Sequence, residues 1–227
     1  MYTKGVSSVL DYSVEGKEEE AQFDAALNMT LKTIEFARER EAIPFAVFKP
    51  TGFGRLALYE KVGDKAHLTE NEQKEWNRVI ERFDIACKTA FEKDVLLLID
   101  AEESWMQDAA DAIVTDMMRK YNKQKAIVFN TLQMYRWDRL DYLKNLHEQA
   151  KSEGFYIGMK LVRGAYMEKE NDRATERGLK SPICVSKEAT DINYDAAVLY
   201  MIDNINKMAI FAGTHNEESS YKLMQLM

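Results

Sequence analysis

Short apolar runs alternate with longer amphipathic stretches along the chain, and this alternation constrains the fold more than any other feature. Most of the runs are apolar at nearly every position, as parallel strands covered on both faces are. Three of them begin at Val95, Ala126 and Ile157, a step of about 31 residues that matches the size of one βα unit. The predicted strands cover residues 6–12, 44–50, 95–100, 126–130, 156–162 and 208–213.

Six strands separated by helices predict an α/β fold, either a doubly wound sheet or a (βα)8 barrel. The first strand is not followed by GxGxxG, which disfavours a dinucleotide-binding doubly wound sheet. Six units do not close a barrel of eight, so either two units are missing or the sheet is open. Polar residues gather at the carboxyl ends of the strands, which is the active-site face of a TIM barrel. They are Asp11, Lys49, Asp100, Asn130, Gln133, Lys160, Arg163, Thr214 and His215.

Several helix boundaries have local signals. Thr69 with Glu72, and Ser104 with Gln107, each match the capping-box pattern of a helix start. Gly154 is a typical C-terminal stop. Two further helices are predicted over 17–40 and 190–206, the second with Ile205 facing inward.

Composition excludes several classes of protein. The 227 residues suffice for one domain, and a hydrophobic fraction of 46% with 30% charged residues is typical of a globular chain. A net charge of −7 argues against nucleic acid as a partner. The two cysteines are too few for a disulfide framework, and no apolar run reaches the ~20 residues of a membrane span. The start of the chain lacks the apolar core of a signal peptide. We therefore expect a cytoplasmic protein, with at most peripheral contact with the inner membrane.

Lys160 and Arg163 stand at the end of an apolar strand, which is an unusual place for two cations. One interpretation is an ion pair with Asp100 or Glu102 across the strand ends. The other is a cationic clamp on a phosphate, a carboxylate or an anionic ring. Gly164 follows directly and would let the backbone approach such a ligand closely.

Asp100 ends an apolar strand, and Glu102 lies just after it. Glu102 fits the first turn of the next helix, where the helix dipole favours a negative charge. Asp100 needs a cation, which Lys49 or Lys160 would supply. A divalent metal held by Asp100 and Glu102 is an alternative, although no further acidic strand end completes a ligand set.

Two other strand ends carry candidate groups. Lys49 precedes Pro50 in a glycine-rich loop and is either a solvated lysine or a ligand contact. Thr214 and His215 follow the last strand, where a histidine is more often structural than catalytic. His147 is expected on a helix surface.

At "KLVRGAY" the sequence resembles the central motif of proline dehydrogenases, which oxidise proline to pyrroline-5-carboxylate with FAD. Five further motifs resemble the family in the same order, so that the likeness spans the chain and is specific. The family fold is a distorted (βα)8 TIM-type barrel with FAD at the carboxyl ends of the strands. The other motifs are "SSVLDYSVEG", "AVFKPTGFGR", "LLLIDAEESWMQ", "IVFNTLQMY" and "GTHNEES".

The resemblance implies a role for each strand-end residue. Asp100 matches the aspartate of the active-site polar network, and Lys160 stands where bacterial members usually have an arginine near flavin N5. Lys49 matches the lysine that helps to bind the carboxylate of L-proline. The residues implied in FAD binding are Ala101, Gln133, Arg163, Gly164, Ala165, Thr214 and His215.

The resemblance also implies an incomplete barrel. The family continues beyond "YKLMQLM" with a last strand and a helix whose arginines clamp the substrate carboxylate. We therefore expect residues 1–227 to form one barrel domain truncated at the C-terminus, with six of the eight βα units and little turnover. A quinone is the implied electron acceptor. The alternatives are a metal-dependent TIM-barrel lyase or hydrolase, and a non-catalytic remnant.

Overall fold

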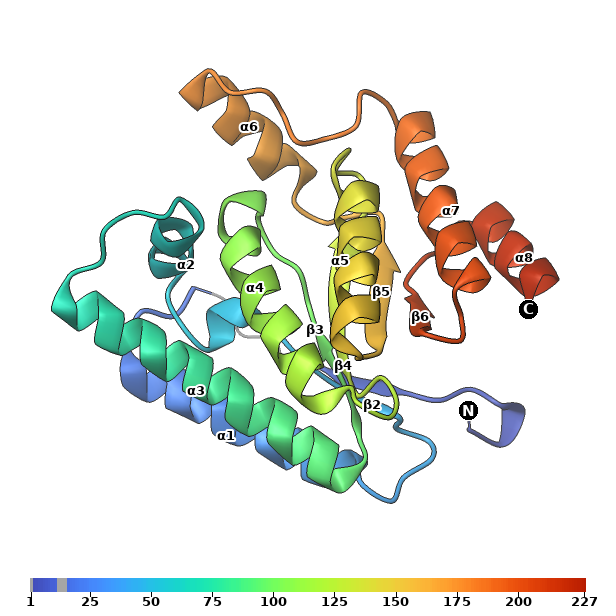
Figure 1. Cartoon of the computed structure of the whole chain (residues 1–227), viewed down its shortest axis with the longest axis horizontal. Helices are drawn as coiled ribbons and strands as arrows, with labels where there is room; N and C mark the ends of the chain where they lie inside the picture. Colours follow the sequence, from blue (N-terminus) through green and yellow to red (C-terminus); the bar gives the residue numbers. More distant parts are fainter. Residues whose placement is uncertain (1, 12–15) are drawn as a thin grey trace.

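A computed structural model describes residues 2–11 and 16–227, in which a parallel sheet is covered by helices on one side (Figure 1). None of the helices in these ranges is long and apolar enough to cross a membrane. The strands are β1 (Val9–Asp11), β2 (Phe45–Phe48), β3 (Leu96–Ile99), β4 (Val128–Gln133), β5 (Ile157–Val162) and β6 (Met208–Ala212). The helices are α1 (Glu20–Ala37), α2 (Leu56–Gly63), α3 (Glu70–Lys93), α4 (Ser104–Tyr121), α5 (Arg139–Glu153), α6 (Met167–Arg177), α7 (Lys187–Asp203) and α8 (Glu217–Leu226), with 3₁₀ turns at Tyr2–Lys4 and Pro50–Gly52.

The strands follow one another in the sheet as they do in the sequence, from β1 to β6, and every neighbouring pair is parallel. The predicted α/β class with strands and helices in alternation is therefore confirmed. In the part of the chain that the structure describes, β1 and β6 form the two edges of the sheet. Each predicted strand overlaps an observed one, although Tyr12, at the end of the first, lies outside the described residues.

An aromatic contact shows that the sheet curls. The rings of Phe45 on β2 and Phe211 on β6 have centroids 5.2 Å apart and meet edge to face. In a flat sheet, strands four places apart would be separated by about 19 Å. Phe129 on β4 also meets Phe45, with centroids 5.4 Å apart. The sheet therefore bends around these three rings, as the wall of a barrel does.

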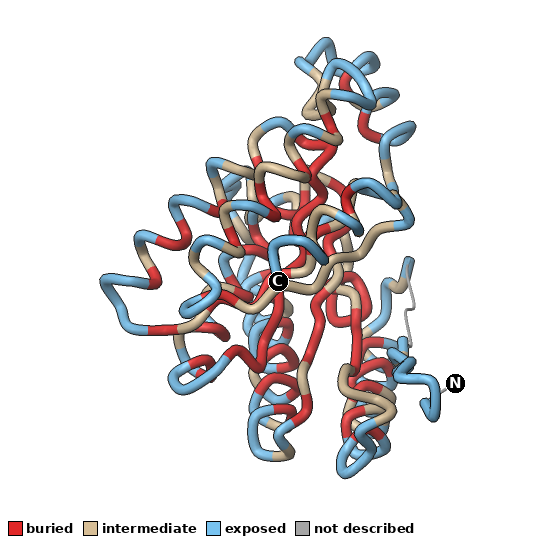
Figure 2. The backbone as a smooth tube through the Cα atoms, turned by 90° about the vertical axis from the view of Figure 1, so that its right-hand side faces the viewer, coloured by how far each residue is buried: buried red, intermediate tan, exposed pale blue. Residues whose placement is uncertain are grey.

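The curl gives the sheet an outer face and an inner face with separate cores. Side chains alternate between the faces along each strand. On β3, Leu97 and Ile99 join the large core between sheet and helices, whereas Leu98 packs with Val47 and Phe129 inside the curl. Figure 2 shows the buried backbone through the middle of the molecule and exposed backbone along the outer sides of the helices.

Two of the predicted helix boundaries are confirmed. The Thr69 hydroxyl accepts a hydrogen bond from the Glu72 backbone N–H, and the Glu72 carboxylate accepts one from Thr69 N–H at 2.9 Å, which completes a capping box before α3. Gly154 ends α5 in the left-handed conformation, with φ of 69°. Both signals are local, so neighbouring residues suffice to predict them.

The second predicted capping box is wrong. Glu103 is the N-cap residue of α4, and Ser104 is already the first helical residue. The Ser104 hydroxyl donates instead to Glu170 of α6, at 2.6 Å. Helices α2 and α6 lie in segments for which the sequence predicts none, and β4 extends past Asn130 to Gln133.

Two predictions near α7 also need correction. The helix ends at Asp203, before Ile205, whose side chain is exposed rather than inward-facing. His147, expected on a helix surface, is buried because α7 packs against α5 there. Its Nδ1 lies 2.8 Å from the Tyr200 hydroxyl oxygen. Contact between two helices that are distant in sequence overrides the local pattern.

Gly158 is the position on β5 where the curl leaves no room for a side chain. A Cβ atom there would lie 2.6 Å from Val128 O and 2.7 Å from the Phe129 ring. We expect Gly158→Ala to lower the free energy of unfolding by about 1–3 kcal/mol, because backbone and a packed ring must move. Urea denaturation measures the change.

Gly63→Ala is the matched control, because a Cβ atom at Gly63 meets nothing closer than 3.5 Å. Its stability should equal that of the parent protein or slightly exceed it. Equal unfolding midpoints for the two variants would contradict the described packing of β4 against β5.

Candidate functional site

A cavity of about 540 Å³ lies at the carboxyl ends of the strands. All ten residues to which the family resemblance assigns a role line it, so the fold brings together groups that are up to 166 positions apart (49 to 215). Two other strand-end residues expected on this face do not line it: Asp11 lies outside the lining, and Asn130 donates to Asp111 of α4 on the helix side of the sheet. Their individual roles stay predictions. The lining residues are Lys49, Asp100, Ala101, Thr131, Gln133, Lys160, Val162, Arg163, Gly164, Ala165, Tyr166, Lys187, Gly213, Thr214, His215 and Asn216.

The alternation of side chains along the strands places these groups. Val47 and Leu98 belong to the core inside the curl, and two residues further along their strands stand Lys49 and Asp100. On β4, the next inward positions after Phe129 are Thr131 and Gln133, both cavity residues. The inner apolar core is therefore the floor of the cavity, and the inward-facing polar residues that follow it on β2, β3 and β4 form part of its wall.

Lys160 and Asp100 form an ion pair across the wall. The Lys160 Nζ donates to Asp100 Oδ1 at 2.6 Å, and the two side chains are 18% and 17% exposed. The ion-pair interpretation therefore holds for Lys160, and Lys160 is the cation that Asp100 was expected to need. Both groups still line the cavity. The pair fixes the Lys160 ammonium at the strand ends, where a ligand would meet it.

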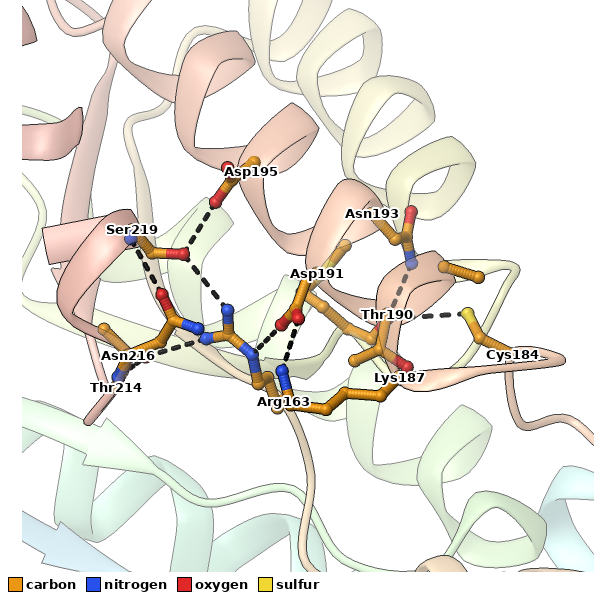
Figure 3. A network of polar contacts seen from close by, with 12 residues as sticks. Arg163, Cys184, Lys187, Thr190, Asp191, Asn193, Asp195, Thr214, Asn216 and Ser219 are labelled. Atoms are coloured by element: carbon orange, nitrogen blue, oxygen red, sulfur yellow. Dashed lines mark hydrogen bonds and ion pairs between the residues drawn. The ribbon is translucent and has the colours of Figure 1, made fainter.

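Arg163 is held by a separate network on the β6 side (Figure 3). Its Nε donates to Asp191 of α7 at 2.5 Å, and its two terminal nitrogens donate to the hydroxyls of Thr214 (2.7 Å) and Ser219 (3.1 Å). The guanidinium also lies over the Tyr194 ring, 4.5 Å from its centroid. Arg163 thereby ties β5 to α7 and α8.

The predicted alternative that Arg163 pairs with Asp100 or Glu102 is wrong. The acid that it meets is Asp191, which also accepts a hydrogen bond from Lys187 at 2.6 Å. Asp191 lies on α7, and helix α6 separates it in the sequence from the motif that contains Arg163. No spacing in the sequence therefore indicates that Asp191 pairs with Arg163. An anion that binds at Arg163 would share the guanidinium with this carboxylate.

The Gln133 side chain spans the middle of the wall. Its Nε2 donates to Glu102 O at 2.7 Å, and its Oε1 accepts from Ala165 N–H at 3.1 Å. Gly164, between Arg163 and Ala165, has φ of 138°, and a Cβ atom there would lie 2.6 Å from the Tyr135 ring. Only glycine fits this turn without strain.

Glu102 is buried outside the cavity, so the alternative metal pair is not assembled. Both of its carboxylate oxygens accept hydrogen bonds from Thr51, one from the backbone N–H at 2.9 Å and one from the hydroxyl at 2.5 Å. Asp100 is engaged by Lys160 instead. Within residues 2–11 and 16–227, no group of three or more His, Cys, Asp and Glu side chains is placed to hold a metal ion.

Some residues that line the cavity were not proposed from the sequence. Thr131 and Val162 were detectable in principle, since each lies two residues from a proposed residue on the same strand and so faces the same side of the sheet. Tyr166 follows the "KLVRGAY" glycine and alanine, and its hydroxyl accepts from Lys49 Nζ at 3.2 Å. Lys187, Gly213 and Asn216 also line the cavity, and only long-range folding brings Lys187 there.

The charges that line the cavity oppose the charge of the whole chain. Four cationic side chains and one acidic side chain line it, although the net charge of the protein is −7. Lysine and arginine gathered in a concave site raise the local concentration of anionic ligands. The cavity is therefore suited to a ligand with negative charge.

The sequence profile described as "Proline dehydrogenase" matches residues 1–227. The chain belongs to the proline dehydrogenase family. The carbapenem antibiotics biosynthesis protein CarD of Pectobacterium carotovorum is 37% identical over 97% of this chain and 57% of its own length. Human mitochondrial proline dehydrogenase 1 is 36% identical over 68% of this chain and 26% of its own length. The chain thus spans about half the length of the first relative and about a quarter of the length of the second.

Solved structures of proline utilization A share the fold. The protein from Bdellovibrio bacteriovorus, solved after inactivation by N-propargylglycine, superposes with a TM-score of 0.82 at 19% identity, over 99% of this chain and 24% of that one. The protein from Corynebacterium freiburgense gives 0.82 at 16% identity, over 99% and 23%. The curled sheet of this proline dehydrogenase family member therefore matches the family's distorted TIM barrel.

Burial raises the pKa of Glu102 from 4.5 to about 7, against the opposing effect of the Thr51 hydrogen bonds. The folded protein therefore holds this proton more tightly than the unfolded chain does. The resulting stabilisation is complete below about pH 4.5 and is lost as the pH rises to about 7. Glu102→Gln removes this dependence, and we expect the variant to gain up to about 3 kcal/mol relative to the parent between pH 5 and pH 8. Urea denaturation at several pH values measures it.

Glu81→Gln is the control, since Glu81 is exposed on α3. Its stability should follow that of the parent protein at every pH. Parallel stability curves for the parent and Glu102→Gln would contradict a buried carboxyl group that titrates near neutral pH.

Proposed function

We propose that this chain carries the FAD and substrate site of a proline dehydrogenase, which oxidises L-proline to 1-pyrroline-5-carboxylate. The observation that carries the proposal is the convergence of the polar residues of five family motifs on one cation-lined cavity. Membership of the family supports the reaction type. The cofactor, the substrate and the electron acceptor are parts of the proposal.

The residues of the cavity fit FAD. A diphosphate needs cations and exposed backbone, which Arg163, Lys187 and the turn at Gly164 offer together. A second groove of about 1320 Å³ continues from that turn between α6 and the start of α7. Cavity and groove share Arg163, Lys187 and the segment 164–166, so an elongated dinucleotide would have room along both.

When bound, FAD supplies the hydride acceptor for oxidation of the carbon beside the proline nitrogen. The chain contributes charge and position. Lys160, held by Asp100, places a fixed cation where negative charge develops, which is an electrostatic contribution that is often worth several kcal/mol. Lys49 directly follows β2, whereas Lys160 is on β5, so β3 and β4 lie between the two strands in the sheet. Lys49 would hold the proline carboxylate. The apolar floor formed by Phe129 and its neighbours keeps water from the base of the cavity.

A quinone is the proposed electron acceptor, on the strength of the family resemblance. Peripheral contact with a membrane would follow from the use of a membrane quinone. A proline dehydrogenase assay with a soluble quinone analogue separates this part of the proposal from flavin reduction, because only reoxidation of the flavin depends on the acceptor.

A second candidate substrate comes from the relative that is named for carbapenem biosynthesis and that matches 97% of this chain. A carbapenem nucleus contains a five-membered nitrogen ring with a carboxylate, and before its nitrogen is acylated such a ring is a substituted proline. Proline and a ring-substituted proline each lose a hydride from the carbon beside nitrogen and a proton from the N–H, so a cavity with a carboxylate-binding lysine and a hydride acceptor would suit either compound. Parallel assays with proline and with a ring-substituted proline decide between them.

The test is anaerobic addition of proline to the flavin-loaded protein, followed through the visible flavin absorbance. We expect proline to bleach the bound flavin. Reduction needs only one pass of the reaction, so the loss of absorbance reports on hydride transfer to the flavin without its reoxidation. Lys160→Met should slow bleaching by about 10²–10³-fold, because one charge-stabilising donor is lost, whereas Lys160→Arg should retain most of the rate.

Lys123→Met is the control, since Lys123 lies at the opposite end of the barrel, between α4 and β4. It should bleach at the parent rate. Bound flavin that stays oxidised with proline but is reduced by the ring-substituted proline would favour the second substrate. Failure to bind FAD at all would overturn the proposal and favour a non-catalytic remnant.

A further inference from the structure

A buried ion pair lies behind the cavity wall, on the helix side of the sheet. Arg139 of α5 donates to Asp111 Oδ2 of α4 at 2.9 Å, and the two side chains are 6% and 4% exposed. Neither residue lines the cavity at the strand ends. Buried ion pairs add little net stability, because desolvation offsets the attraction of the charges. Stability alone therefore does not account for this ion pair behind the cavity wall.

The Asp111 carboxylate is an acceptor for three donors. Besides Arg139, its Oδ1 accepts from Gln107 Nε2 at 2.7 Å and from Asn130 Nδ2 at 2.8 Å. Gln107 and Asn130 are 3% and 1% exposed, so water does not substitute for these contacts. An ionised carboxylate accepts at both oxygens and donates nothing. Asp111 thereby determines which end of the Gln107 amide faces it.

The contact with Gln107 continues to the cavity through the backbone of one residue, Glu102, whose N–H and C=O belong to two successive peptide groups. Because Gln107 Nε2 is used by Asp111, its Oε1 faces the Glu102 N–H and accepts from it at 2.9 Å. The Glu102 carbonyl accepts from Gln133 Nε2 at 2.7 Å, which leaves Gln133 Oε1 to accept from Ala165 N–H at 3.1 Å. Reversal of either glutamine amide would set donor against donor and acceptor against acceptor.

We infer that Asp111 is a positioning residue for the cavity: by orienting Gln107 it holds the Glu102 backbone in place, and through the Glu102 carbonyl it thereby holds the Gln133 amide and the 163–165 turn in place. The inference rests on the proposed function, because FAD is the ligand whose binding depends on the position of this wall. The chain of donors and acceptors runs from α5 through α4 to β4 and the turn after β5. It touches the cavity only at Gln133 and Ala165.

A purely structural pair would behave differently. If Asp111 and Arg139 merely held α4 and α5 together, removal of Asp111 would lower stability, and removal of the Gln107 amide would leave Ala165 unchanged. We call the chain of hydrogen bonds from Asp111 through Gln107, Glu102 and Gln133 to Ala165 the relay. If the relay positions the cavity wall, loss of either Asp111 or Gln107 changes the hydrogen bond at Ala165. Gln107→Leu therefore separates the two roles, because it interrupts the relay and keeps the contacts of Asp111 with Arg139 and Asn130.

The experiment compares Asp111→Asn and Gln107→Leu with the parent protein by two readouts. In the protein without added FAD, the backbone amide of Ala165 is followed by NMR, as its proton shift and its exchange with solvent. With FAD added, the dissociation constant is measured from flavin fluorescence. We expect both variants to shift the Ala165 proton upfield and to speed its exchange about tenfold, and to weaken FAD binding about tenfold.

Asp108→Asn is the matched control. It makes the same chemical change on the same helix, but the Asp108 side chain is 70% exposed and lies 4.0 Å from Arg139. It should leave both readouts at parent values. An unchanged Ala165 amide in Gln107→Leu would overturn the inference. If the parent protein binds no FAD, the proposed function fails, while the Ala165 amide still decides whether the relay exists.

Discussion

The alternation of side chains along a curled parallel sheet is the constraint on which the rest of the structure depends. Because the sheet bends until Phe45 of β2 meets Phe211 of β6, one face of every strand points into a narrow interior. Apolar residues fill that interior, and the next inward position on β2, β3 and β4 is polar. The same two-residue period therefore builds the floor of the cavity and its polar wall.

The wall is held from behind by charged and polar contacts with the helices. Arg163 is tied to α7 and α8, and Gln133 is tied to α4 through the Glu102 carbonyl. Glu170 of α6 accepts two hydrogen bonds from Ser104 at the start of α4, so α6 is held near the carboxyl ends of the strands. Positions of the ligand-facing groups thus depend on residues that a ligand would not touch.

The strands and the cavity were predictable from sequence because each depends on local order. Apolar runs indicate the strands, and the first polar residue after a run marks the carboxyl end of β2 and of β3, as Lys49 and Asp100 illustrate. The carboxyl ends of parallel strands lie at the same end of the sheet, so most of the strand-end residues line the cavity, whereas Asn130 faces the helices and donates to Asp111. The family motifs add the expected roles, which remain to be measured.

The partners of these groups were not predictable in the same way. Arg163 meets Asp191 rather than Asp100, and His147 is buried by Tyr200, because helices distant in sequence pack together. Ser104 carries a capping pattern that Glu170 overrides from α6. No periodicity reports such pairings, since each is decided by the three-dimensional packing of the helices on the sheet.

The central claim is that a flavin dinucleotide binds at the carboxyl ends of these strands. The most direct measurement is titration of FAD into the isotopically labelled chain, with backbone amide shifts recorded by NMR. The account predicts that the largest changes fall at residues 100–101, 133, 160, 162–166 and 213–216, which line the cavity. Changes concentrated elsewhere, for example in the outer cleft between α4 and α5, or no change at all, would contradict it.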